Sequence, residues 1–131
     1  MPDRVQPQLG MDTPTVLFDF PAALGSLARS KPGLPSRVER WELFIAGLEI
    51  ANAYSELISY DEQKSRFETA AQLRREQQRD IYPLDEQYMA LLRKGRLPES
   101  GGIALGIDRL LMVLTNASEL GEVVPFTPET N

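Results

Sequence analysis

Carboxylates are the most abundant of the residues in this sequence that could carry out chemistry, and two of them lie on either side of a predicted turn. Glu42 and Glu49 flank Ala46-Gly47, which separates two strand-like runs, residues 38–45 and 48–54. If Ala46-Gly47 is a two-residue turn, strand alternation places both glutamates on the same side of a hairpin. Adjacent carboxylates repel each other unless a cation lies between them, so the pair predicts a Mg²⁺ site that also holds nucleotide phosphates. The alternative is two glutamates on a solvated outer face.

Three further residues, Asn52, Tyr54 and Glu56, continue the polar series along the second strand. They are two residues apart and therefore share one side of a regular strand. Glu49 is an odd number of residues away and would lie on the opposite side. A single pocket containing Glu49 and Asn52 requires a bulge or a break between them.

Residues 102–107 form the other unusual run. Small residues alternate there with branched apolar ones, in the order Gly102, Ile103, Ala104, Leu105, Gly106, Ile107. A strand with this pattern has a nearly bare face on which a flat molecule could lie. The alternative is a buried strand whose glycines are crossed by a helix. We expect Asp108 to cap the following helix and Arg109 to lie in its first turn.

Composition limits the chemistry further. The chain has 131 residues, of which 42% are hydrophobic and 25% charged, and this predicts one globular domain. Cysteine and histidine are both missing from the sequence, which excludes disulfides, a thiolate metal site and histidine-based acid–base catalysis. The net charge of −5 argues against a free-standing nucleic-acid binder. No run is long and apolar enough for a membrane span, and no signal peptide is recognisable, so we expect no membrane partner and a cytoplasmic location.

The remaining elements predict an α+β fold. Residues 15–20 should form a buried strand and residues 30–36 a surface loop. A helix should cover residues 60–79, and a second helix should begin near residue 84 and end at Gly95. The hairpin and the glycine strand then form an antiparallel β-sheet flanked by these helices.

The run 101–112 resembles the third signature motif of the class II aminoacyl-tRNA synthetases, a glycine strand followed by a helix that opens with an arginine. The resemblance implies that Gly106 lies under ATP and that Arg109, the catalytic arginine, packs on the adenine and reaches the terminal phosphate. Glu42 and Glu49 would hold metal-bound ATP, so the implied cofactors are ATP and Mg²⁺.

The order Glu49-x-x-Asn52-x-Tyr54-x-Glu56 resembles that of the lysine-specific enzymes of this class. By that resemblance Asn52, Tyr54 and Glu56 line the amino-acid pocket, and the carboxylate of Glu56 selects a substrate ammonium group. Ala104 stands where lysyl-tRNA synthetases usually have glycine, and its methyl group should enter the substrate pocket. In this respect the chain is more similar to the synthetase paralogue that attaches lysine, by preference the β isomer, to elongation factor P.

The resemblance covers residues 1–131 as one domain, the C-terminal portion of the synthetase catalytic core, with motif 3 at 101–112 and with motifs 1 and 2 absent. The chain is then either a fragment or a short relative, with an oligomer possible. Three functions follow as hypotheses. The first is ATP-dependent activation of lysine or β-lysine and its transfer to elongation factor P, incomplete in this chain. The second is a lysyl-tRNA synthetase fragment with tRNA as acceptor. The third is a non-catalytic binding or interaction protein with the same fold.

Overall fold

The computed structural model describes residues 5–25 and 27–126, and these form two compact units. The first unit consists of the described residues of Met1–Phe20, Arg40–Ala53 and Ile103–Asn131, and the second of those of Pro21–Glu39 and Tyr54–Gly102. The described part of the chain contains no helix that is long and apolar enough to cross a membrane.

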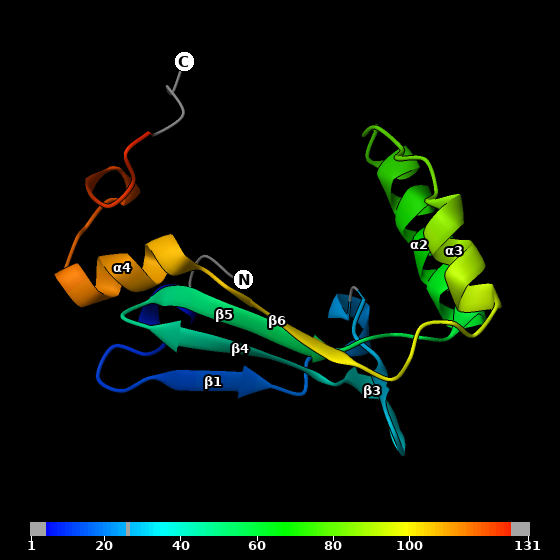
Figure 1. The fold of residues 1–131 in the computed structure, drawn as a ribbon, viewed down its shortest axis with the longest axis horizontal. Coiled ribbons are helices and arrows are strands. Elements are labelled where there is room, and N and C mark those ends of the chain that lie inside the picture. The colour runs from blue at the N-terminus through cyan, green and yellow to red at the C-terminus, as the bar shows by residue number, and fades with distance from the viewer. Residues whose placement is uncertain (1–4, 26, 127–131) are drawn as a thin grey trace. The chain divides into compact units, whose positions relative to one another are not determined.

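The first unit is organised around an antiparallel sheet. The strands of the sheet are β1 (Thr15–Phe18), β4 (Arg40–Ile45), β5 (Leu48–Ser55) and β6 (Gly101–Leu105), in the spatial order β1-β4-β5-β6 (Figure 1). Residues 54–55 of β5 and 101–102 of β6 belong to the second unit. The predicted hairpin is confirmed as β4 and β5. Ala46 and Gly47 join them with φ angles of 50° and 76°, the left-handed values that a type I′ turn needs at both central positions.

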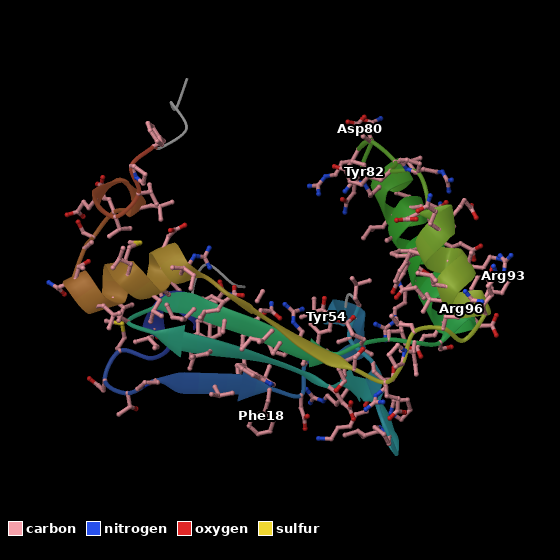
Figure 2. The ribbon with its side chains drawn as sticks, in the orientation of Figure 1. Phe18, Tyr54, Asp80, Tyr82, Arg93 and Arg96 are labelled. Carbon is pink, nitrogen blue, oxygen red and sulfur yellow. The ribbon has the colours of Figure 1, made fainter. Side chains whose placement is uncertain are left out.

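Strand β1 is present as predicted, but the prediction that it is buried is wrong. It pairs with β4 from Thr15↔Phe44 to Phe18↔Trp41 and ends the sheet on that side. Val16 is 51% exposed and Phe18 is 67% exposed, and Phe18 projects away from the ribbon (Figure 2). Apolar composition alone therefore did not distinguish an edge strand from a central one.

The glycine run forms β6 and leads directly into α4 (Ile107–Thr115). All five residues of β6 are exposed, including Ile103 at 61% and Leu105 at 46%. Gly106 is the N-cap of α4 and no side chain caps the helix, so the prediction that Asp108 is the cap is wrong. Asp108 lies one residue inside the helix, where its carboxylate faces the positive end of the helix dipole.

The second unit contains a hairpin where a loop was expected. β2 (Ser30–Lys31) and β3 (Leu34–Val38) pair antiparallel, and Gly33 takes a φ angle of 74° in the turn between them. Pro32 and Gly33 thus form a tight turn, which corrects the prediction of a surface loop at 30–36. A short 3-10 helix, η2 (Ala22–Leu24), precedes the hairpin.

Both predicted helices are present in the second unit. α2 (Tyr60–Glu76) begins at Ser59, whose hydroxyl accepts from the Glu62 N–H at 3.4 Å, and it ends three residues before the predicted limit. α3 (Glu86–Arg93) begins at Asp85, whose carboxylate accepts from two backbone N–H groups. The Phe67 and Tyr88 rings join the helices edge to face, with centroids 6.5 Å apart. Packing of the two helices against the sheet stays a prediction.

Candidate functional site

Glu42 and Glu49 lie on one side of the β4–β5 hairpin and share a hydrogen-bonding partner. The Nδ2 of Asn52 donates to Glu42 Oε1 at 3.2 Å and to Glu49 Oε1 at 3.4 Å. Because Glu49 and Asn52 have opposite parity, these contacts require β5 to depart from strict alternation between them. Ile50 and Ala51, which are consecutive and both buried, mark the place of this departure.

Glu42 is the most buried member of this group, since only 4% of the residue is exposed. Burial raises the pKa of its carboxyl group above the ordinary value, and the nearby charge of Glu49 raises it further, while Arg40 acts in the opposite direction. The Nη2 of Arg40 lies 2.5 Å from Glu42 Oε1. A solvated outer face is therefore the wrong description for Glu42.

Arg40 is a residue that the sequence analysis missed. It lies two positions before Glu42 in β4, and residues two apart on a strand project to the same side, so strand periodicity could have identified it. Composition gave no reason to prefer it over the other arginines of the chain.

Arg109 reaches the hairpin from the first turn of α4. Its Nη1 donates to the carbonyl oxygen of Glu49 at 2.9 Å, and the N–H of Gly106 donates to the carbonyl oxygen of Ile50 at 2.9 Å. A methyl group added at Gly106 would meet its nearest neighbours at 3.6 Å, an ordinary contact distance. The space around Gly106 is therefore large enough for a methyl group and does not itself require glycine at this position.

A pocket of about 350 Å³ opens beside these contacts, within the first unit. It is lined by five of the predicted site residues: Glu49, Asn52, Ala104, Gly106 and Arg109. The structure thus brings together the glycine strand, the motif arginine and one of the two carboxylates. Glu42 lies behind Asn52, to which it is hydrogen-bonded, and does not line the pocket.

Tyr54 and Glu56 belong to the second unit. A methyl group added at Gly102, which is also in the second unit, would lie 3.4 Å from Glu56 Oε1, so the Glu56 carboxylate lies over the bare backbone of that glycine. Tyr88 of α3 is their neighbour and was not among the predicted site residues. Burial raises the pKa of the Tyr88 hydroxyl, with smaller contributions from Glu56 and Tyr54.

The donor set fits a hard cation. Among the described residues no cluster of three or more acidic, histidine or cysteine side chains is present, so the protein ligands at this position would be the carboxylates of Glu42 and Glu49. Mg²⁺ commonly takes one or two carboxylates and completes its shell with water and phosphate oxygens. The carboxylate pair is suited to that mode of binding.

The α+β fold, the motif strand and the carboxylate pair define a class II synthetase-like segment. The family model for tRNA synthetases class II (D, K and N) matches residues 4–130. The chain belongs to this family.

Two groups of relatives share about two fifths of its residues. An elongation factor P--(R)-beta-lysine ligase of Pectobacterium carotovorum is 40% identical over 125 residues, which cover 95% of this chain and 38% of the relative. A lysine--tRNA ligase of Prochlorococcus marinus is 42% identical over 113 residues, which cover 86% of this chain and 22% of the relative. The chain therefore spans well under half the length of these relatives.

Proposed function

We propose that this chain provides the Mg²⁺–ATP site and the lysine pocket of an ATP-dependent lysine ligase, of the type that modifies elongation factor P. The observation that carries the proposal is the contact of the Asn52 amide with both carboxylates, Glu42 and Glu49, beside a pocket that also contains Arg109. Names of the relatives support a lysine-type substrate, since both groups are ligases of lysine or β-lysine.

Each side chain has a distinct role in this proposal. Glu42 and Glu49 hold Mg²⁺, which when bound neutralises part of the charge of the ATP phosphates. Arg109 provides a permanent, planar positive charge, suited to stacking on the adenine and to contacting a phosphate oxygen. Its bond to the Glu49 carbonyl fixes it at the edge of the pocket before ATP arrives.

The amino-acid pocket is assigned to Asn52, Tyr54, Glu56 and Ala104 by the resemblance to the lysine-specific enzymes. Glu56 pairs with the side-chain ammonium of the substrate, and the methyl group of Ala104 narrows the pocket on the glycine strand. Alanine at position 104 favours the ligase of elongation factor P over the tRNA ligase. The two groups of relatives are equally similar in sequence, so tRNA remains the second candidate for the acceptor.

Turnover is not proposed for residues 1–131 in isolation. Motif 2 is not recognisable in this sequence. In the class II synthetases the arginine of motif 2 contacts the α-phosphate. Loss of one such electrostatic partner commonly lowers the rate by about a hundred- to a thousand-fold. Lysine-dependent exchange of pyrophosphate into ATP measures this step, and robust exchange by the isolated chain would contradict this part of the proposal.

Binding is the direct test of the site. Calorimetric titration of the chain with ATP should give saturable binding in the presence of Mg²⁺ and much weaker binding in EDTA. Arg109→Lys and Glu49→Gln should each weaken the binding by about tenfold or more, because each removes a charge-assisted contact. Arg93→Lys, in the second unit, is the matched control and should have no effect. Binding that is equal with and without Mg²⁺, or equal in the three variants, would refute the proposed site.

A further inference from the structure

Arg40 makes contacts that single it out among the basic residues of the first unit. Its guanidinium donates through two different nitrogens, from Nε to Asn52 Oδ1 at 3.3 Å and from Nη2 to Glu42 Oε1 at 2.5 Å. Its Cζ lies 4.7 Å from the centre of the Phe20 ring, and its side chain is only 18% exposed. The planar group is thus held on one face by an aromatic ring and on its edge by two polar partners.

The contact with Asn52 determines which end of the amide faces the carboxylates. Because Oδ1 accepts from Arg40, Nδ2 is the atom that points toward Glu42 and Glu49. In the flipped orientation, Oδ1 would face two negative charges and Nδ2 would face a guanidinium, so every one of these contacts would become repulsive. Arg40, Asn52 and Glu42 therefore form a closed ring of hydrogen bonds with a single favourable orientation.

We propose that Arg40 is a positioning residue for the Mg²⁺–ATP site. It fixes the carboxylate of Glu42 directly and that of Glu49 through the Asn52 amide, so that both carboxylates are oriented before the cation binds. The inference rests on the proposed function, because the Mg²⁺–ATP site is the one named above. The guanidinium of Arg40 acts through the Asn52 amide and the two carboxylates and does not itself contact ATP.

The orientation can be measured without any ligand. In ¹H–¹⁵N spectra of the chain, the side-chain amide of Asn52 is assigned by its loss in Asn52→Ala. Arg40→Met keeps the aliphatic stem but removes both donors, and it should shift this signal and make its protons exchange with water about tenfold faster. Arg40→Lys keeps the charge but not the two-nitrogen geometry and should give an intermediate result. An Asn52 signal that is unchanged in Arg40→Met would overturn the proposal.

Binding provides the second readout. Partners that orient metal ligands typically contribute about 10- to 100-fold to affinity, and Arg40→Met should weaken Mg²⁺–ATP binding by that factor in calorimetry. The matched control is Arg29→Met, because Arg29 also holds a glutamate through two nitrogens: its Nε and Nη2 lie 3.0 Å and 2.8 Å from Glu39 Oε2, in the second unit. It should leave both the affinity and the Asn52 signal unchanged.

The outcomes separate the two proposals. Equal weakening of binding in Arg40→Met and Arg29→Met would mean that loss of any such arginine disturbs the site, and this would overturn the positioning role. A wild-type chain that does not bind Mg²⁺–ATP would refute the proposed function. The ligand-free spectra of Arg40→Met would then still decide whether Arg40 orients the amide.

Discussion

The substitution Asn52→Asp should convert the carboxylate pair into a cation-dependent cluster. Asn52 Nδ2 now donates to two carboxylate oxygens, at 3.2 Å from Glu42 and 3.4 Å from Glu49. Aspartate places an oxygen where this nitrogen is, so two attractive contacts become repulsive at nearly constant volume. The backbone and the packing are otherwise little changed, and the electrostatic effect is therefore isolated.

The size of the effect follows from these distances. Two like charges about 4 Å apart repel by about 4 kcal/mol at an effective dielectric constant of about 20. The new carboxylate also gains attraction from Arg40, whose Nε lies 3.3 Å from the present Oδ1. We expect a net decrease of about 2 to 4 kcal/mol in the free energy of unfolding at neutral pH without divalent ions.

Urea unfolding with and without Mg²⁺ is the assay. Mg²⁺ should restore more stability to Asn52→Asp than to the wild type, because a cation between three carboxylates binds the folded chain preferentially. Asn52→Ala is the control: it loses the hydrogen bonds without adding a charge, and its response to Mg²⁺ should not exceed that of the wild type. Equal responses of the Asp and Ala variants to Mg²⁺ would show that Glu42 and Glu49 do not form a cation site.

Three further substitutions test other parts of the chain. Glu56→Gln should weaken lysine binding by about 2 to 5 kcal/mol in calorimetry, because the substrate ammonium loses its ionic partner. Ala104→Gly should change the preference between lysine and β-lysine by about 1 to 3 kcal/mol, and unchanged affinities in both variants would remove these residues from the pocket. Hydrogen bonds from Ser55 and Arg29 hold the pKa of Glu39 below its ordinary value. Its stabilisation is therefore present above the unfolded pKa of about 4.3 and is lost as the pH falls through the lower folded pKa. Urea unfolding should accordingly show a larger deficit for Glu39→Gln at pH 7 than at pH 3, and equal deficits would contradict this reasoning.

Local signals in the sequence were sufficient for much of the fold. The Ala46-Gly47 turn, the start of α2 and the glycine strand each depend on a few neighbouring residues. The turn and the start of α2 were located correctly, and the limits of the glycine strand to within two residues. The β2–β3 hairpin was missed because Gly33 was taken as a loop residue, although its positive φ angle serves a tight turn between two short strands.

Interactions between distant residues were harder to predict. The exposure of β1 depends on its place at the end of the sheet, which composition does not record. The proposed role of Arg40 depends on its contact with Asn52, twelve residues later. That contact accompanies the irregularity in β5, which the sequence predicts only if Glu49 and Asn52 share one pocket. The placement of Glu42 and Glu49 on one side of the hairpin could be predicted from the sequence, because a two-residue turn fixes the register of its hairpin.

Strands β1 and β6 end the sheet on its two sides, and each has a second edge that no described strand covers. Their exposed apolar side chains, among them Phe18 and Ile103, lie beside rows of backbone N–H and C=O groups that a further strand can pair with. Charged residues and prolines, which commonly block such edges, are not found within either strand. Edge-to-edge pairing of two chains depends on protein concentration, so keeping this chain dispersed in solution is a separate requirement from folding it.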